Sequence, residues 1–361
     1  MEADCRGAPH DLSRVARCLK HTMTPLRLSI CIPTHNFGDF IGDAIKSVQT
    51  QYVPGTDIVI LDGGSTDRTR EVVESYQARC SYIHYHFQSF KGGIDADLAR
   101  SVELAHGEYC WLLSADDALV DGALKRIHRE LDAACDVYLC NRILCDLSLK
   151  PERSQSWLRG GSTDFEINLG DDAALFRYFG RAVSVGALFS YMSTIIFKRS
   201  SWALSEPAPG LTGTNYSHVQ RLFSMRGFNA RMKYLAAPLV LCRTGNDSFM
   251  SRGVTARYLI DMHGFDTAAH TIFPHDARLR SRFKGVVNRE HRWTNWVWLR
   301  TVIKDDAEWA KVVRELMRYG YGKSAIVAIE WLAKSRCYAF LRALRGMTAR
   351  TLSRMRRRTI E

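Results

Sequence analysis

The sequence of 361 residues lacks several features that would define its class at once. It has no run of about 18 consecutive apolar residues, so no membrane-spanning helix is predicted. Its ten cysteines form no C-x-x-C pair, and several lie in apolar runs, which indicates free thiols in a reducing compartment. Residues 1–26 contain charges but no continuous apolar segment, so we expect an N-terminal extension and not a secretory signal. No internal repeat is present.

Basic charge is concentrated at the C-terminus. The formal net charge is +12, and the last 31 residues hold nine basic residues against one acidic residue. Because the remainder is nearly balanced, this pattern indicates local contact with an anionic surface and no nucleic-acid partner. Apolar residues recur there every three to five positions, which predicts a basic amphipathic helix that lies on a membrane through residues 335–358. Packing of this apolar stripe on the rest of the protein is the alternative.

Short apolar runs alternate with amphipathic stretches from Arg27 onward, as is typical of βαβ units. We expect strands at residues 28–32, 57–61, 82–87, 109–113, 137–143, 193–197 and 234–242, and helices at 40–50, 68–78, 95–105, 122–133 and 216–225. Residues 151–185 read as irregular structure followed by a helix. The fold class is therefore α/β, with a Rossmann-like, mostly parallel sheet flanked by helices.

The pattern divides the chain into three parts. Residues 27–245 form the sheet domain, with a first part at 27–145 and a second at 146–245. Residues 246–361 form a helical C-terminal region, with helices expected at 281–301, 307–319 and 323–355. This region is an appendix that ends in the basic amphipathic tail.

Polar clusters follow the first, second and fourth predicted strands, where parallel sheets bind ligands. Asp62 ends a strand ahead of any helix-cap position, so it is expected to accept a hydrogen bond from a ligand. Asp116 and Asp117 are adjacent carboxylates that would repel each other without a nearby cation. Such oxygen ligands suit Mg²⁺ or Mn²⁺. The alternative for both clusters is a turn that caps the next helix.

The clusters together resemble the ordered motifs of family 2 glycosyltransferases of the GT-A fold. The matching segments are residues 29–36 (SICIPTHN), 60–67 (ILDGGSTD), 105–109 (AHGEY) and 113–117 (LSADD). A later segment, residues 243–249 (RTGNDSF), is similar to the lid-like segment of bacterial transferases for O-antigen and other surface polysaccharides, such as abequosyltransferases.

The resemblance implies an inverting enzyme that moves a sugar from a nucleotide-diphosphate sugar to a hydroxyl of a glycan. It also implies a lipid-linked acceptor and a cytoplasmic location, peripheral to the inner membrane. Residues 27–145 would bind the donor, and residues 146–245 would face the acceptor. It implies that Mn²⁺ or Mg²⁺ is held by Asp116, with Asp117 beside it. The implied donor-binding residues are Pro33, Thr34, Asn36, Asp62, Lys91, Asp97, Ser114, Ala115 and Asp116.

Two positions depart from the family pattern. Ser114 replaces the first acid of the usual Asp-x-Asp, and Gly63 replaces the second acid of Asp-Asp-Gly-Ser. The region that usually carries the catalytic acid, residues 213–220, contains none. His218 is our candidate base because imidazole titrates near neutrality, and Asp247 is the second candidate. Arg243 is expected to assist at the diphosphate because guanidinium suits phosphate oxygens.

Three rival interpretations remain at this level. A nucleotidyltransferase could use Asp116 and Asp117, although the first strand-to-helix turn lacks a glycine-rich, lysine-containing signature. A nucleic-acid-binding protein could use the arginine-rich tail. A transferase-like protein that has lost catalysis would be consistent with Ser114.

Overall fold

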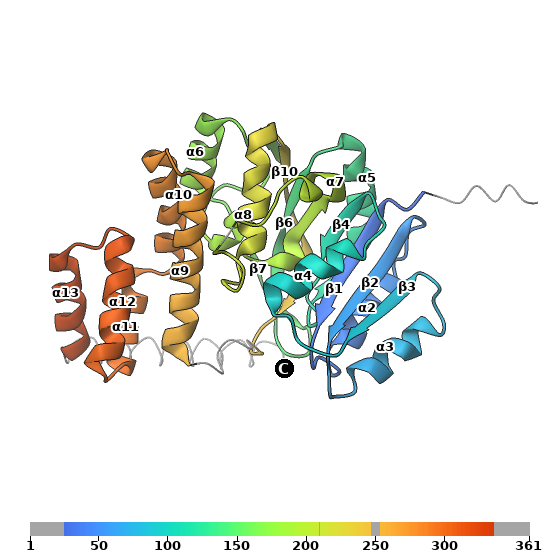
Figure 1. Ribbon diagram of the computed structural model, residues 1–361, viewed down its shortest axis with the longest axis horizontal. Helices are drawn as coiled ribbons and strands as arrows, with labels where there is room; N and C mark the ends of the chain where they lie inside the picture. The colour runs from blue at the N-terminus through green and yellow to red at the C-terminus, as the bar shows by residue number, and fades with distance from the viewer. Residues whose placement is uncertain (1–24, 209, 247–252, 336–361) are drawn as a thin grey trace, which may run out of the picture.

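The computed structural model describes residues 25–208, 210–246 and 253–335. A sheet with covering helices fills one side of the molecule, and the C-terminal helices extend from it on the other (Figure 1). The sheet portion contains the following elements in chain order: β1 (Leu28–Thr34), α2 (Ile41–Gln49), β2 (Thr56–Gly63), α3 (Thr69–Gln77), β3 (Ile83–Gln88), α4 (Ile94–Glu103), β4 (Tyr109–Leu112), β5 (Ala118–Leu119), α5 (Ala123–Glu130), β6 (Val137–Cys145), β7 (Pro151–Gln155), β8 (Phe165–Asn168), α6 (Asp172–Arg181), β9 (Ile195–Lys198), α7 (Arg199–Ala203), α8 (Ser217–Ser224) and β10 (Arg231–Arg243).

The sheet has a parallel half and a mixed half. Its main strand order is β3-β2-β1-β4-β9-β6-β10-β5, and β3, β2, β1 and β4 are mutually parallel. β9 runs antiparallel to both β4 and β6, whereas β6 and β10 are parallel. The segment 151–185, expected to be irregular before its helix, instead contributes β7 and β8 to the sheet, because they pair with β6 and β10. The predicted α/β fold is confirmed, and the parallel pairing dominates its first half.

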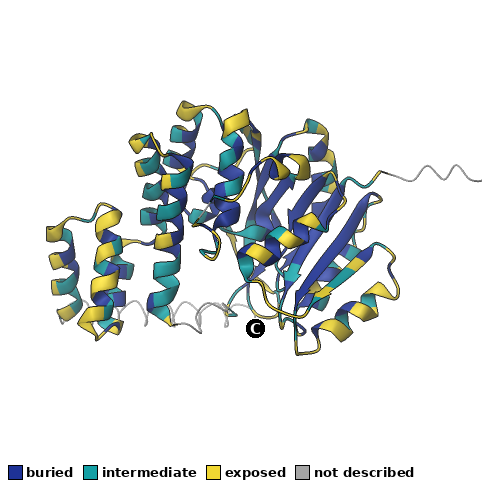
Figure 2. Ribbon diagram, in the orientation of Figure 1, coloured by how far each residue is buried: buried dark blue, intermediate teal, exposed yellow. Residues whose placement is uncertain are grey.

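Alternating residues of the central strands face two separate cores. Ile30 and Ile58 pack in the core that contains the apolar residues of α2 and α5, whereas Cys31 and Val59 pack in the core that contains those of α4. Successive strand residues point to opposite faces, so continuous apolar runs such as those of β1 and β2 indicate strands covered on both sides. Figure 2 shows these strands buried along their length.

The C-terminal helices share the second of these cores. They are α9 (Val254–Ile272), α10 (Ala277–Glu290), α11 (Trp293–Val302), α12 (Asp306–Arg318) and α13 (Lys323–Lys334). Their buried residues, including Trp296 and Trp309, belong to one continuous cluster with the α4 face of the sheet. The single helix expected at 281–301 is two helices, because the backbone leaves the helical conformation at His291. Residues 336–361, which contain most of the predicted tail, lie outside the described residues.

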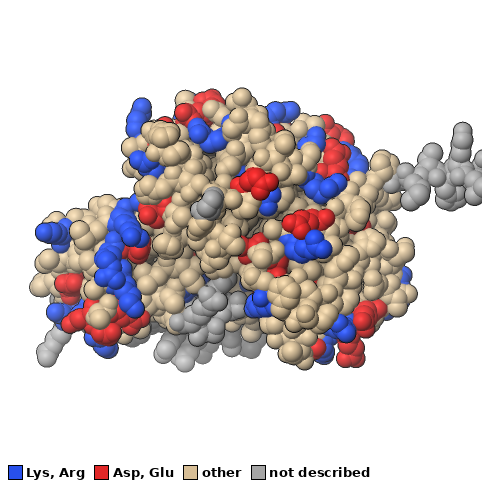
Figure 3. All heavy atoms as spheres, viewed as in Figure 1, with Lys and Arg blue, Asp and Glu red and all other residues tan. Residues whose placement is uncertain are grey.

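The surface carries mixed charge. Figure 3 shows acidic and basic side chains interspersed over one face, as expected from the nearly balanced charge of the chain before its basic C-terminal segment. No helix in the described ranges is both long enough and apolar enough to cross a membrane.

Candidate active site

The three polar clusters meet at one edge of the sheet. β1 lies between β2 and β4, and Thr34 at the end of β1 is in register with Asp62 near the end of β2. β4 ends at Leu112 and is followed closely by residues 114–117. Because these strands are parallel, their carboxyl ends open on the same side. We call residues 33–38, 62–67 and 114–117 the carboxyl edge.

Two turns of the carboxyl edge are tied together by hydrogen bonds. The Asn36 backbone N–H donates to Ser65 Oγ at 2.8 Å, and the Thr66 N–H donates to the Asn36 side-chain oxygen at 2.8 Å. Asn36 has a φ of 60°, a left-handed conformation that asparagine tolerates better than most residues. His35 Nδ1 lies 2.8 Å from the Gly63 carbonyl oxygen. These contacts hold the half-buried Pro33 and the exposed Asn36 on a rigid support.

Asp62 is fully buried, and both of its carboxylate oxygens already accept hydrogen bonds. The Ser65 N–H donates to Oδ1 at 2.8 Å, and the Tyr85 hydroxyl donates to Oδ2 at 2.7 Å. Burial and the Asp62 carboxylate raise the pKa of Tyr85 to about 12, so this hydroxyl stays protonated. Asp62 therefore orders Ser65 and Tyr85 around it, and its direct contact with a ligand stays a prediction.

Gly63 makes room for Asp97. A Cβ atom at position 63 would lie 3.3 Å from Asp97 Oδ2, which is closer than most Cβ contacts. Asp97 is buried and accepts hydrogen bonds from Gln88 Nε2 at 2.6 Å and from the Gly92 N–H at 3.1 Å. The departure from the family's second acid thus has a local reason, because Asp97 already places a carboxylate beside this position. Lys91, which directly precedes Gly92, is exposed.

Thr34 carries an unpartnered hydroxyl. The residue is 5% exposed, and its buried Oγ1 has no hydrogen-bond partner. A buried hydroxyl without a partner costs about 1–3 kcal/mol, so such groups in native proteins call for an explanation. Its position at the carboxyl edge makes it a candidate contact for a bound ligand.

Asp116 is the more accessible of the two adjacent carboxylates. It is partly exposed, its Oδ1 accepts a short hydrogen bond from Ser114 Oγ, and its Oδ2 accepts one from Asn246 Nδ2 at 2.6 Å. Ser114, which replaces the family's first acid, therefore orients the second one. Ala115 between them is buried.

Asp117 is not placed to bind a metal ion, which corrects the sequence-based expectation. It is 1% exposed, and one oxygen accepts hydrogen bonds from Ser193 Oγ at 2.5 Å and from the Tyr191 hydroxyl at 2.6 Å. Its other oxygen lies 3.2 Å from the Arg243 N–H. Burial, with the Asp116 charge, raises its pKa to about 7. Two neighbouring carboxylates have taken opposite orientations, one inward and one outward.

Arg243 also differs from its expected role. Its side chain is 2% exposed, and Nε donates to the Asp116 carbonyl oxygen at 2.9 Å. One terminal nitrogen donates to Asp43 Oδ2 at 2.8 Å and the other to the Leu147 carbonyl oxygen. All three nitrogens are thus engaged within the chain, so Arg243 is a positioning residue that supports the Asp116 backbone.

His218 lies in the first turn of α8 and is 4% exposed. Nε2 is 2.9 Å from the Phe189 carbonyl oxygen, so it carries the proton, and the buried Nδ1 has no partner. Burial lowers the pKa of His218 against the opposing influence of Asp95. The ring is therefore neutral with a free lone pair, but it is covered in this conformation. Asp247, the second candidate, lies outside the described residues.

Asp95 holds the turn that leads into α8, and the sequence analysis did not identify it. One oxygen accepts hydrogen bonds from the N–H groups of Gly213 and Asn215 at 2.8 and 2.9 Å. The other accepts from the N–H and hydroxyl of Ser217 at 3.1 and 2.8 Å. With four donors around it, Asp95 is saturated and acts as a support. The only signal in the sequence was an acid in the first turn of α4, which is typical of any helix.

Replacing Asp95 with alanine should destabilise the protein by about 2–3 kcal/mol, because four donors lose their acceptor in a buried place. Urea unfolding measures this loss. Glu103→Ala is the control, since Glu103 is an exposed acid on the same helix and forms a surface ion pair with Arg100. Equal stability of the two variants would contradict the supporting role.

The donor set at the carboxyl edge fits a hard divalent cation held by a single protein carboxylate. The described residues contain no group of three or more His, Cys, Asp or Glu side chains that could hold a metal ion. Mg²⁺ in particular often binds through one or two carboxylates, with substrate phosphates and water completing its shell. Asp116 can supply such a ligand; Asp117 cannot.

Comparisons with known proteins agree with this architecture. Glycosyl transferase family 2 matches residues 29–189, which include all three parts of the carboxyl edge. The chain is 33% identical over 274 residues to the abequosyltransferase RfbV of Salmonella typhimurium, covering 74% of this chain and 81% of the relative. It is also 33% identical over 102 residues, 28% of this chain and 33% of the relative, to a Campylobacter jejuni GalNAc(5)-diNAcBac-PP-undecaprenol beta-1,3-glucosyltransferase.

A solved structure shows the same fold. TarS 1–349 of S. aureus in complex with UDP-GlcNAc matches 81% of this chain and 80% of its own, with a TM-score of 0.60 at 18% identity. The GT-A fold expected from the sequence is thereby confirmed. Since the Salmonella relative matches over four fifths of its length and the family motifs lie together at the carboxyl edge, this chain belongs to glycosyl transferase family 2 and is a glycosyltransferase.

Proposed function

We propose that this glycosyltransferase moves a sugar from a nucleoside diphosphate to a hydroxyl of a lipid-linked surface-polysaccharide precursor, with inversion at the anomeric carbon. The observation that carries the proposal is the meeting of Thr34, Asp62 and Asp116 at the ends of adjacent parallel strands. The names of the relatives support it, since one is an abequosyltransferase and another acts on an undecaprenol-linked glycan. The structural neighbour was solved with UDP-GlcNAc.

In this proposal the donor lies along the carboxyl edge. The unpartnered Thr34 hydroxyl contacts the nucleotide, and Asp62 shapes the pocket for the base through Ser65 and Tyr85. The other proposed contacts are Pro33, Asn36, Lys91, Asp97, Ser114 and Ala115, which lie on this edge or on the turn beside it.

Asp116 is the proposed ligand of Mn²⁺ or Mg²⁺. A bound divalent cation would offset the negative charge that develops on the departing diphosphate. The chain's own contribution is to hold the carboxylate ready: Ser114 and Asn246 bond to its oxygens, and Arg243 fixes its backbone. Ser114, Asn246 and Arg243 act in this proposal by positioning Asp116.

The attacking hydroxyl needs a base on the acceptor side, and we propose His218. Its Nε2–H bond to the Phe189 carbonyl oxygen sets the tautomer, which leaves Nδ1 as an acceptor. Asp95 holds the turn before it. Because the ring is covered, this role requires that acceptor binding uncovers Nδ1. Asp247 stays the alternative base.

A thermal-shift screen of nucleoside diphosphates with Mn²⁺ tests the donor site. One of them should raise the melting temperature of the wild type, and the rise should be smaller in Thr34→Val. Without ligand, the variant should be as stable as the wild type or about 1 kcal/mol more stable, because an unpaired buried hydroxyl is removed. Thr50→Val, at an exposed threonine after α2, is the matched control. If no nucleoside diphosphate shifts the wild type, the proposed donor class is wrong.

Membrane contact through residues 335–358 is likewise a proposal. It is supported by the basic charge of this segment, and a lipid-linked acceptor would give it a purpose. A cytoplasmic location at the inner membrane would follow from both.

We propose that the domain boundaries lie between residues 26 and 27 and between residues 245 and 246.

A further inference from the structure

A groove of about 450 Å³ between α6 and α10 is lined by three arginines and by no carboxylate of the described residues. Arg278, Arg282 and Arg289 lie four and seven residues apart on α10, so they share one face of the helix. Ser281 adds a hydroxyl, and Phe176 of α6 forms the opposite wall. Figure 1 shows α6 and α10 well apart from β1, β2 and β3. The groove is therefore separate from the carboxyl edge.

Two guanidinium groups share one aromatic ring at this groove. The central carbons of Arg282 and Arg278 lie 4.7 and 5.3 Å from the Phe176 ring centre. Arg282 Nε is buried and has no hydrogen-bond partner. A Cβ atom at Gly180 would lie 2.6 Å from a terminal nitrogen of Arg282, so the glycine lets the guanidinium approach α6 closely. Stacking on an aromatic face offsets only part of the cost of an unpaired charge.

Arg289 adds a third positive charge and is anchored. Its guanidinium donates to the carbonyl oxygens of Phe179 and Ala182 at the end of α6. Burial lowers the pKa of Arg289, and the nearby charges of Arg282 and Arg159 lower it further. None of these arginines forms an ion pair with a carboxylate in the described part of the chain.

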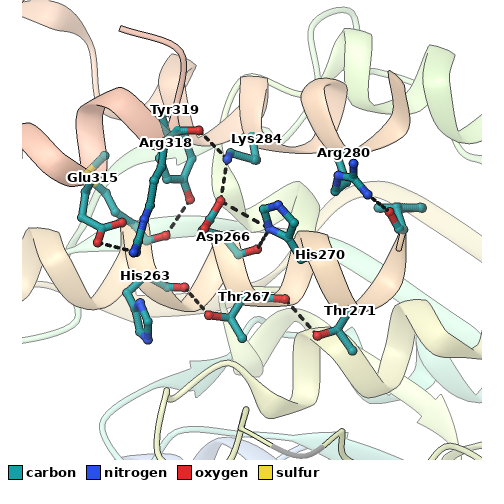
Figure 4. A network of polar contacts seen from close by, with 12 residues as sticks. His263, Asp266, Thr267, His270, Thr271, Arg280, Lys284, Glu315, Arg318 and Tyr319 are labelled. Atoms are coloured by element: carbon teal, nitrogen blue, oxygen red, sulfur yellow. Dashed lines mark hydrogen bonds and ion pairs between the residues drawn. The ribbon is translucent and has the colours of Figure 1, made fainter. Parts of the chain in front are cut away.

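A neighbouring groove beside α9 differs from this one because its basic side chains are paired with acidic side chains. There Lys284 bonds to Asp266 Oδ1 at 2.5 Å and to the Arg318 carbonyl oxygen, so its charge is compensated (Figure 4). Arg318 itself pairs with Glu315 at 2.8 Å. Both grooves border α10, yet only the one at α6 leaves its cations without anions.

We infer that the groove between α6 and α10 binds a phosphate-bearing anion through Arg278 and Arg282, with Arg289 as a positioning charge. Guanidinium groups match the geometry of phosphate oxygens and form two parallel hydrogen bonds to them. The ligand supplies the negative charge that the surrounding residues do not. Its phosphate belongs either to a soluble compound or to the headgroup of an anionic lipid.

Calorimetric titration of the full chain with inorganic pyrophosphate in EDTA tests this inference. Arg282→Gln and Arg278→Gln should each weaken binding about tenfold or more, as expected for loss of a charge-assisted contact. Arg314→Gln, at an exposed arginine of α12, removes the same charge elsewhere and should leave the affinity within about twofold. Weaker binding in both groove variants separates this groove from the donor site, because neither arginine lies on the carboxyl edge. Because Arg278 is exposed, its variant should fold normally even if the Arg282 variant does not.

Two results would overturn the inference: no binding of pyrophosphate, or equal binding by the wild type and both groove variants. Sedimentation with phosphatidylcholine vesicles, with and without phosphatidylglycerol, then distinguishes the sources. If the groove variants lose pyrophosphate and also bind anionic vesicles more weakly, the ligand is a headgroup. If they lose pyrophosphate but sediment like the wild type, the ligand is a soluble phosphate compound.

Discussion

Asp116→Asn should lower sugar transfer by about a thousandfold or more, which corresponds to roughly 4 kcal/mol of lost transition-state stabilisation. Asparagine keeps the shape of the side chain and can still contact Ser114 and Asn246, but it removes the negative charge that the proposed cation needs. The loss should therefore appear in kcat, with a melting temperature close to that of the wild type. Steady-state rates at increasing Mn²⁺ concentration measure it.

Asp121→Asn is the matched control for this experiment. Asp121 is an exposed aspartate five residues further along, so the same substitution there should leave the rate unchanged. Asp117→Asn is not a suitable control, because the Asp117 carboxylate is buried and bonded to Ser193 and Tyr191. Normal turnover by Asp116→Asn would remove Asp116 from the proposed metal site.

His218→Gln should lower turnover by about 10²- to 10⁴-fold, the usual contribution of a general base. Glutamine can still donate a hydrogen bond toward the Phe189 carbonyl oxygen, so the substitution removes the basic nitrogen while keeping a polar group in this buried place. Donor binding should change little, because His218 lies on α8 and not on the carboxyl edge. Single-turnover rates and the KM for the donor separate the two effects.

The pH dependence gives an independent reading of the same variant. Protonation of His218 should make kcat/KM decrease at acidic pH. Because burial lowers the pKa of His218, the apparent pKa of this decrease should lie below the usual value of 6.5. A lowered folded-state pKa also means that neutral His218 contributes stability above pH 6.5, and that this contribution is lost as pH falls through the lowered value. A structural role alone predicts only the change in stability. Loss of the decrease in kcat/KM in His218→Gln, but not in a variant of the exposed His263, supports the base; near-normal rates would move the base to another residue.

The position of the carboxyl edge was predictable from the sequence, whereas the orientation of its side chains was not. Apolar runs that end in polar clusters predicted parallel strands, and parallel strands bring their ends together by geometry alone. The adjacent acids Asp116 and Asp117 look equivalent in the sequence. Hydroxyl groups of Tyr191 and Ser193, more than 70 residues away, turn one of them inward.

The same limit explains Arg243 and Asp95. The Arg243 guanidinium was predicted to contact phosphate. In the structure it donates hydrogen bonds to Asp43 and to the Asp116 carbonyl oxygen instead. Asp95 appeared to be an ordinary acid at a helix start, and only the approach of residues 213–217 shows its role. Contacts between residues more than 100 positions apart leave no local pattern to read.

The sequence by itself determined the α/β fold, the edge of the sheet where the polar motifs gather and the concentration of charge in the C-terminal segment. These depend on local periodicity and on composition, which can be read directly from one sequence. The tertiary structure decided which acid faces outward, which cations are already bonded and which are left unpaired at the groove between α6 and α10. Burial and hydrogen bonding set those outcomes, because the state of a charged group depends on partners that only folding brings within reach.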